Sequence, residues 1–225
     1  MQKIGHRGAK GHLTENTLES FQKAIDLGVD AIELDVHQCA SGELIVFHDF
    51  TLERLTNGEG EISKFTWEQL QHFKIVDQYR IPTLIETLEV IDRKCNVNIE
   101  LKGHHTAKAT ALVVEEFVQN KSWHYSDFIV SSFQYEELEK FSNLNSKIPL
   151  AVLTQASVEQ AVEWAKKFQA RYIHPHFSLL TTDNCNFAKA NDLKINTWTV
   201  NDPIDIEHVK RFTIDGIISD FPDRI

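Results

Sequence analysis

The chain has 225 residues, of which 42% are hydrophobic and 25% charged, and this composition is typical of a soluble globular protein. Its formal net charge of −10 argues against a broad basic face, so we expect no nucleic-acid partner. The sequence has no apolar run long enough to span a membrane. Its first residues also lack the apolar core of a signal peptide, so we expect no stable membrane anchor.

The three cysteines, Cys39, Cys95 and Cys185, are odd in number and far apart in the sequence. They form no CxxC pair, so neither a disulfide framework nor a cysteine-ligated zinc site is expected. Reduced thiols fit a reducing compartment, and we therefore expect a cytoplasmic protein.

Eight strand-like segments alternate with helical ones along most of the chain. The expected strands are residues 2–5, 29–36, 97–102, 128–132, 150–153, 172–174, 195–200 and 216–219. The first helix is expected over residues 17–27, where Asn16 and Glu19 form a reciprocal cap and Gly28 ends the helix. Later helices are expected to begin near Ala107, Gln134, Ser157, Thr181 and Asp202.

Strands that alternate with helices form parallel sheets. Eight such units in a chain of this length favour a (β/α)₈ TIM barrel that occupies residues 1–225 as one domain. An open doubly wound sheet is the structural alternative. No GxGxxG follows the first strand, which counts against the dinucleotide-binding form of that fold.

A hairpin is expected directly after the second strand. The letters "CASGEL" at 39–44 carry a Ser-Gly turn signal between two strand-like runs, residues 36–38 and 43–48. If Ser41 and Gly42 form a two-residue turn, Asp35 lies opposite His48.

The sequence then departs from the strand–helix rhythm over residues 49–82, which we interpret as a small insertion. Thr66 and Gln69 are expected to cap a short helix within it. Thr83 and Glu86 form a second capping box, for a helix that returns the chain to the barrel.

Alternation along the strands predicts a cluster of carboxylates. Side chains of a strand point to opposite faces in turn, so Glu33 and Asp35 share one face and point into the barrel mouth. The same reasoning directs Glu100 and Lys102 inward from the third strand. Buried carboxylates need protons, cationic side chains or a metal ion, and oxygen-only ligands suit Mg²⁺ or Ca²⁺. A structural network in which Arg7 and Lys102 neutralise the acids is the alternative.

Two histidines are expected at the same mouth. His6 ends the first strand, and the hairpin register places His48 beside the carboxylates. Arg7 follows His6 and can bind a phosphate group in two-pronged fashion. Such a set indicates acid–base chemistry on a metal-bound phosphoryl group.

The sequence resembles the glycerophosphodiester phosphodiesterase family through short motifs that run in order over essentially the whole chain. The matching segments are "GHRG" at 5–8, "ENTLESF" at 15–21, "IELDV" at 32–36, "VFHDFTLERLTNGEG" at 46–60, "IPTLIETL" at 81–88, "NIELK" at 98–102, "VSSF" at 130–133, "NTWTVND" at 196–202 and "DGIISDFPD" at 215–223. The one visible departure is "DFTLER", which replaces a more usual proline-containing form after the histidine.

The resemblance implies a barrel of the phosphatidylinositol-phospholipase-like type and hydrolysis of glycerophosphodiesters to sn-glycerol 3-phosphate and an alcohol, within lipid and glycerol metabolism. It also implies one divalent cation, Mg²⁺ or Ca²⁺, a small-molecule substrate and a monomer or homodimer. The residues that it assigns are Glu33, Asp35 and Glu100 as metal ligands, His6 and His48 as catalytic histidines, Arg7 and Lys102 as phosphate-binding cations, and Glu15 and Trp198 as supporting or pocket-lining residues.

Two other functions share parts of this pattern. A lysophospholipase D or sphingomyelinase-D-like enzyme would use the same acids and histidines on a lipid, and an apolar rim around the mouth would favour it. A non-catalytic barrel that binds a phosphorylated ligand belongs to a different class. Such a binding module needs no paired proton donor and acceptor, so the presence of both His6 and His48 argues against it.

Overall fold

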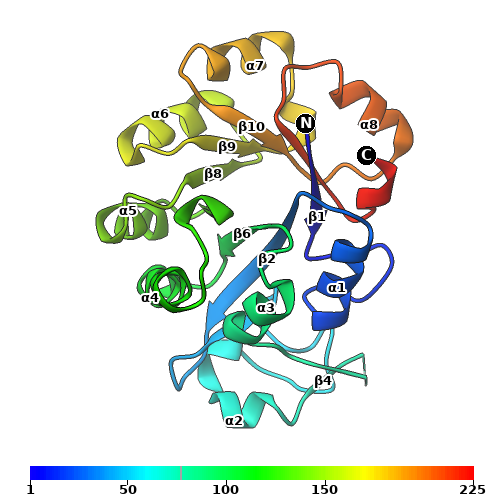
Figure 1. Ribbon diagram of the computed structural model, residues 1–225, viewed down its shortest axis with the longest axis vertical. Helices are drawn as coiled ribbons and strands as arrows, with labels where there is room; N and C mark the ends of the chain where they lie inside the picture. The colour runs from blue at the N-terminus through cyan, green and yellow to red at the C-terminus, as the bar shows by residue number, and fades with distance from the viewer. Residues whose placement is uncertain (77) are drawn as a thin grey trace.

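The expected strands form a closed parallel barrel in the computed structural model, which describes residues 1–76 and 78–225 (Figure 1). The eight barrel strands follow one another in the order β1, β2, β6, β7, β8, β9, β10 and β11. β1 pairs in parallel with β2 on one side and with β11 on the other, and these two pairings close the sheet. The predicted (β/α)₈ fold is confirmed.

The barrel strands have the following bounds: β1 Gln2–His6, β2 Ala31–Gln38, β6 Asn96–Leu101, β7 Phe128–Ser132, β8 Leu150–Thr154, β9 Tyr172–Pro175, β10 Lys194–Thr197 and β11 Gly216–Ser219. Most lie within a residue of their predicted positions. β2 begins and ends two residues later than predicted, and because the side-chain period is two, this shift leaves every side chain on its expected face. β10 ends before Trp198, which forms only an isolated bridge with His176.

In the residues that the structure describes, seven α-helices surround the barrel, and an additional short one lies in the insertion. Those around the barrel are α1 Leu18–Asp26, α3 Leu84–Ile91, α4 Thr106–Asn120, α5 Tyr135–Leu144, α6 Val158–Phe168, α7 Thr182–Lys189 and α8 Pro203–Val209. Short 3₁₀ helices are present at Ile62–Lys64, Tyr125–Asp127, Phe177–Leu179 and Pro222–Arg224. Helix starts match the predictions, and the Thr83–Glu86 capping box of α3 is present.

The predicted cap of α1 is wrong. Thr17 is the N-cap, and its hydroxyl accepts a hydrogen bond from the Ser20 amide. Asn16 has a left-handed backbone with φ of 56°. Its side chain donates instead to Asp35 at 2.9 Å, so it is not available to cap the helix. This difference places Asn16 at the barrel mouth.

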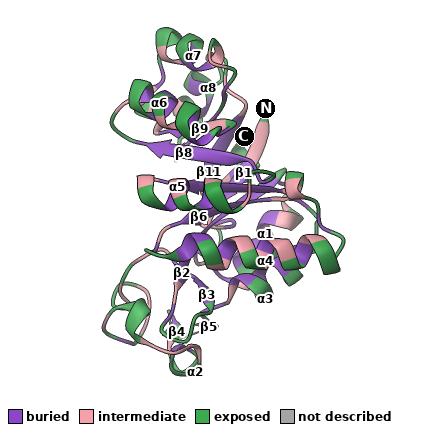
Figure 2. Cartoon of the chain, turned by 90° about the vertical axis from the view of Figure 1, so that its left-hand side faces the viewer, coloured by how far each residue is buried: buried purple, intermediate pink, exposed green. Residues whose placement is uncertain are grey.

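The core lies mainly between the barrel strands and the helices. The outward-facing residues of β2 and β6, such as Ile32, Leu34 and Ile99, are fully buried in this layer. Figure 2 shows buried strands inside and helices whose outer faces are exposed. The barrel interior contains a much smaller apolar cluster of Ile4, Ala31 and Ile218, and polar side chains occupy much of the remaining inner face.

The hairpin after β2 is present, but its predicted register is wrong by one residue. Val36 pairs with Val46 of β3, Leu44–Val46, rather than with Phe47. The loop has three residues, because the Cys39 amide donates to Glu43 across it and Gly42 adopts φ of 103°, which glycine readily accepts. Phe47, not His48, therefore lies opposite Asp35.

The described residues of the insertion, 49–76 and 78–82, lie at one end of the molecule, next to α3 (Figures 1 and 2). The insertion contains α2, Trp67–Leu70, and a two-stranded ribbon of β4, Lys74–Ile75, and β5, Tyr79–Arg80. The predicted Thr66–Gln69 capping box of α2 is present. Its apolar residues form a separate cluster with Ile45 and Phe47 of the hairpin. The segment therefore packs directly behind the strand that leads to His48.

Candidate active site

The predicted site residues converge on a cavity of about 320 Å³ at the carboxyl ends of the barrel strands. His6, Arg7, Glu33, His48, Glu100, Lys102 and Trp198 all line this cavity. Asp35 lies directly behind the lining and is only 1% exposed. Glu15 does not line the cavity but contacts it through Arg7, as described below.

A tight turn after β1 positions His6 and Arg7. Arg7 has a left-handed backbone with φ of 50°, and Gly8 follows with φ of 90°. A side chain at Gly5 would collide with the Gly8 carbonyl at 2.4 Å, and one at Gly8 would collide with Ser20. Both glycines of "GHRG" are therefore required by close backbone packing, which lets the histidine and the arginine project into one mouth.

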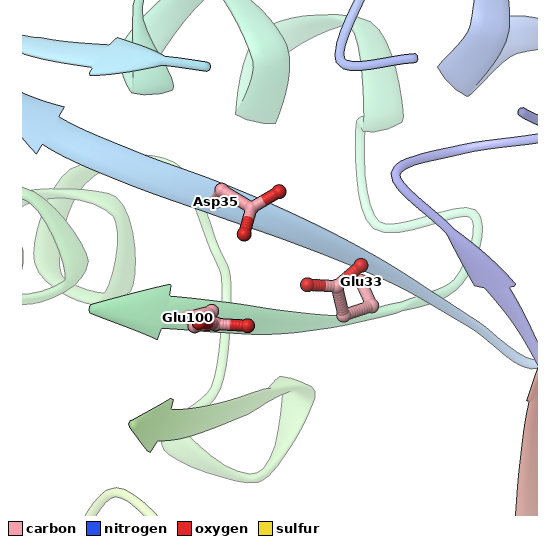
Figure 3. A group of neighbouring side chains, drawn as sticks. All are labelled: Glu33, Asp35 and Glu100. Carbon is pink, nitrogen blue, oxygen red and sulfur yellow. The ribbon is translucent and has the colours of Figure 1, made fainter. Parts of the chain in front are cut away.

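Three carboxylates face one another at this mouth (Figure 3). Glu33 and Asp35 come from β2, and Glu100 comes from the neighbouring β6, where it is directly in register with Asp35. One oxygen from each lies within 4.8 Å of the others. All three side chains are buried, so their charges repel through a poorly screened environment.

The protein neutralises this cluster only in part. Burial and the neighbouring charge of Asp35 raise the pKa of Glu100 to about 7, and the same two causes raise the pKa of Glu33 well above its ordinary value. Burial also opposes ionisation of Asp35, but the nearby Arg7, His48 and Lys102 outweigh it and lower its pKa. The Oδ1 atom of Asp35 is nevertheless buried and has no hydrogen-bond partner among residues 1–76 and 78–225.

Two cationic side chains contact the carboxylates. Lys102 Nζ lies 3.0 Å from Glu100 Oε1 and 4.0 Å from Asp35 Oδ1. Arg7 Nε lies 3.3 Å from Asp35 Oδ2, and its Nη1 lies 2.7 Å from Glu15 Oε1. Burial opposes both charges, yet the surrounding carboxylates outweigh it and raise the pKa of Arg7 and of Lys102. Both side chains stay charged at neutral pH.

A structural network in which Arg7 and Lys102 neutralise the acids is the alternative to a metal ion, and it accounts for only part of the negative charge of the cluster. Arg7 is shared between Asp35 and Glu15, and Lys102 pairs mainly with Glu100. Glu33 receives only the backbone amide of Arg7, at 2.9 Å, as a hydrogen-bond donor in the described part of the chain. A cluster with too few positive charges and an unsatisfied oxygen fits a bound hard cation, for which carboxylates are ordinary ligands.

Each histidine has a carboxylate behind it. His6 Nδ1 contacts Asp220 Oδ1 at 2.6 Å, and His48 Nδ1 contacts Asp49 Oδ1 at 2.6 Å. A carboxylate at Nδ1 selects the tautomer with the proton on that nitrogen and leaves Nε2 able to accept one. The Nε2 atom of His6 lies 4.0 Å from Glu33. Burial lowers the pKa of both rings more strongly than the carboxylates raise it.

Arg54 connects the insertion with the site. Its guanidinium contacts both Asp49, the partner of His48, and Glu15, the partner of Arg7. The distance from Arg54 Nη2 to Glu15 Oε1 is 2.7 Å. Burial opposes ionisation of Glu15, but the hydrogen bond from Arg54 and the charge and hydrogen bond of Arg7 outweigh it and lower the pKa of Glu15.

Sequence reasoning missed Asn16, Asp49, Arg54 and Asp220. Asn16 and Asp49 stand next to residues that were singled out, Glu15 and His48, so their position was a usable signal. Asp220 is 214 residues from His6, and only closure of the barrel brings them together.

Trp198 closes one side of the cavity. Its indole nitrogen donates to the His174 carbonyl at 2.7 Å, and its ring meets Phe133 edge-on at 5.4 Å. These two contacts hold an aromatic wall against the mouth.

Comparison with known proteins decides the family. The model of the glycerophosphoryl diester phosphodiesterase family matches residues 6–224, which is nearly the whole chain. The chain belongs to this family. The resemblance that the motifs indicate is therefore confirmed, and so is the prediction that the chain is a phosphodiesterase.

Relatives of this family match over nearly their full length. The chain is 32% identical over 232 residues to a glycerophosphodiester phosphodiesterase of Caldanaerobacter subterraneus, covering 99% of this chain and 95% of the relative. It is 34% identical over 239 residues to an enzyme of the same name from Bacillus altitudinis, covering 100% and 96% of the two chains.

A solved structure extends the comparison to the fold. An Oleispira antarctica phosphodiesterase, determined in complex with the product sn-glycerol 3-phosphate, superposes with a TM-score of 0.90. The two sequences are 28% identical, and the match covers 99% of this chain and 94% of the other. Among the residues that the structure describes, no helix is long and apolar enough to cross a membrane.

Proposed function

We propose that this protein hydrolyses glycerophosphodiesters to sn-glycerol 3-phosphate and an alcohol, with a divalent cation and two histidines. The observation that carries the proposal is the convergence of His6 and His48 on one three-carboxylate cluster, each with a carboxylate at Nδ1. The product complex of the Oleispira phosphodiesterase supports the choice of substrate class.

Glu33, Asp35 and Glu100 would hold the cation. Their donor set consists of carboxylate oxygens, which favours Mg²⁺ or Ca²⁺ over metals that prefer nitrogen or sulfur. When bound, such an ion supplies Lewis-acid polarisation of a phosphoryl oxygen and lowers the pKa of a coordinated hydroxyl. It would also satisfy the unpartnered Oδ1 atom of Asp35.

The two histidines would transfer the protons. With Nδ1 protonated and bound to Asp220 or Asp49, the Nε2 atom of the basic ring accepts a proton from the attacking glycerol hydroxyl. The other histidine ring donates a proton to the leaving alcohol. The negative charge of the bound phosphodiester favours the protonated form of this ring. A cyclic phosphate formed in this way would then be opened by water with the two roles reversed.

Arg7 and Lys102 would bind the phosphate. Both line the cavity and both carry a charge stabilised by the neighbouring carboxylates. Glu15 holds the Arg7 guanidinium from behind through a 2.7 Å ion pair, which orients the arginine toward the cavity. Trp198 would provide an apolar wall for the glycerol carbons.

The lipid-hydrolase alternative receives less support. A lysophospholipid substrate would require an apolar rim for its acyl chain. Among the described residues, Phe50 is the one large exposed hydrophobic side chain that lies at the mouth, whereas others such as Ile85, Leu112 and Leu144 line separate surfaces. This distribution favours a water-soluble glycerophosphodiester.

A direct assay tests the proposal. Release of sn-glycerol 3-phosphate from glycerophosphocholine should be abolished by EDTA and restored by Mg²⁺ or Ca²⁺. His6→Ala and His48→Ala should each reduce turnover by roughly 10²- to 10⁴-fold while the protein still folds and binds the cation. His72→Ala, at an exposed histidine outside the cavity, serves as the matched control. Absence of product with every divalent ion would contradict the proposed function.

A further inference from the structure

Three large apolar side chains are exposed on the outer wall of the barrel, outside the catalytic cavity. Leu112 on α4 is 62% exposed, Leu144 on α5 is 51% exposed, and Ile85 on α3 is 49% exposed. Figure 2 shows α4 lying across this wall, with α5 above it and α3 below it. Single exposed hydrophobic residues are ordinary, whereas a connected group of them marks a binding surface.

Two surface hollows connect these side chains into one face. The larger hollow, of about 800 Å³, lies between α4 and α5 and is lined by Leu112 and Leu144. The smaller one, of about 610 Å³, lies between α4 and α3 and is lined by Leu112 and Ile85. Leu112 lines both hollows, so it forms a ridge between two grooves. We call the surface formed by Ile85, Leu112 and Leu144 the α4 face.

The exposed ridge of α4 carries opposite charges on the two sides of Leu112. Residues four apart lie on the same side of an α-helix, so Lys108, Leu112 and Glu116 form one line along the ridge, and all three are exposed. Neither Lys108 nor Glu116 makes an ion pair in the part of the chain that the structure describes. The nearby Lys140, by contrast, is paired with Glu137 at 3.2 Å.

We propose that the α4 face binds a second copy of this chain, with the two α4 helices antiparallel and a two-fold axis beside Leu112. Rotation by half a turn places Leu112 against Leu112 of the partner subunit and Lys108 opposite Glu116 of the partner subunit, once at each end of the contact. The same rotation places the α3 sides against each other and the α5 sides against each other, which covers Ile85 and Leu144. A two-fold interface requires this kind of self-complementary surface.

The charge pattern favours a second copy over a membrane. Apolar faces that bind lipid surfaces are flanked by an excess of Lys and Arg, whereas this ridge carries one charge of each sign. The formal net charge of −10 also opposes approach to an anionic bilayer. The same net charge opposes association of two identical chains, so opposite charges must meet where they touch. The inference is independent of the proposed function, because Ile85, Leu112 and Leu144 do not line the catalytic cavity.

Sedimentation velocity of the full chain measures the interface. As its concentration rises through the micromolar range, the wild type should convert from a 25.9 kDa monomer to a species of twice that mass. Leu112→Glu should raise the dissociation constant of the dimer about 100-fold, because it places two like charges together at the axis. Ile204→Glu, at a side chain that is 79% exposed on α8, is the matched control and should leave the dissociation constant unchanged.

Charge reversal tests the antiparallel arrangement. Lys108→Glu and Glu116→Lys should each raise the dissociation constant roughly tenfold, since each places like charges together at both ends of the contact. The double variant restores both pairs and should recover the wild-type dissociation constant. This recovery cannot arise within one chain, because the two residues are about 12 Å apart along α4.

Three results would overturn the proposal. The first is a wild type that stays monomeric, whether or not it binds phosphatidylcholine vesicles through this face. The second is a dimer whose dissociation constant is unchanged in Leu112→Glu, which would place the interface elsewhere. The third is a double charge variant that dimerises no better than the two single variants, which would exclude the antiparallel pairing of α4.

Discussion

The carboxylate cluster should make the cation-free protein less stable as the pH rises. Glu100 has an ordinary pKa of 4.5, which burial and the charge of Asp35 raise to about 7. A carboxyl with a raised pKa binds its proton more tightly in the folded than in the unfolded chain. Its contribution to stability is therefore complete below pH 4.5 and is lost as the pH rises through about 7.

The size of the loss follows from this pKa change. At about 1.4 kcal/mol for each pH unit, the full contribution is about 3 kcal/mol, of which about 2 to 3 kcal/mol disappears between pH 5 and pH 8. Glu100→Gln removes the charge but retains an oxygen that can accept from Lys102, so it should remove this part of the pH dependence. It should also favour ionisation of Glu33, whose pKa Glu100 helps to raise.

Urea unfolding in cation-free buffer at pH 5 and pH 8 measures the effect. The wild type should lose about 2 to 3 kcal/mol more of its unfolding free energy than Glu100→Gln over this range. Glu163→Gln, at an exposed glutamate on α6, controls for the substitution itself. Equal losses of unfolding free energy in the wild type and in Glu100→Gln would refute the idea that burial and the charge of Asp35 destabilise the ionised form of Glu100.

Three further substitutions test the residues that support the site. Asp220→Asn should lower kcat roughly 10- to 100-fold without unfolding the protein, because it removes the carboxylate that fixes the tautomer of His6; an unchanged kcat would contradict this role. Asn16→Ala removes a 2.9 Å hydrogen bond to Asp35 and should weaken cation binding by a similar factor, measured by calorimetry. Arg54→Ala should lower kcat about tenfold, with partial recovery in Arg54→Lys, while changing the unfolding free energy by less than about 1 kcal/mol.

The parts of the site that lie on strands were predictable because alternation has a fixed period. The second strand was placed two residues too early, and this error could not move Glu33 or Asp35 to the other face. An error of one residue in the alternation pattern would have assigned every side chain of the strand to the wrong face. Glu100 followed from the same rule on β6, whose predicted bounds were one residue late at each end.

The parts that depend on loops and on chain closure were not predictable in this way. The Ser-Gly signal in "CASGEL" fits a two-residue turn, but Gly42 can also adopt a left-handed conformation and lengthen the loop to three residues. Asn16 and Thr17 are both good caps, and only tertiary contact with Asp35 decides between them. Asp220 reaches His6 because β11 pairs with β1, a contact that no local pattern encodes.

The charge imbalance at the mouth connects the stability of this protein with its chemistry. Without a cation, the cluster costs the folded state about 3 kcal/mol at Glu100 alone at neutral to alkaline pH. A cation present at a hundred times its dissociation constant would stabilise the folded state by about 2.7 kcal/mol, which nearly offsets this destabilisation. Since protons and the cation compete for the same oxygens, cation affinity should rise as the pH increases through 7. The folded barrel would therefore be most dependent on its cation above pH 7, where Glu100 is ionised and the mouth carries its largest negative charge.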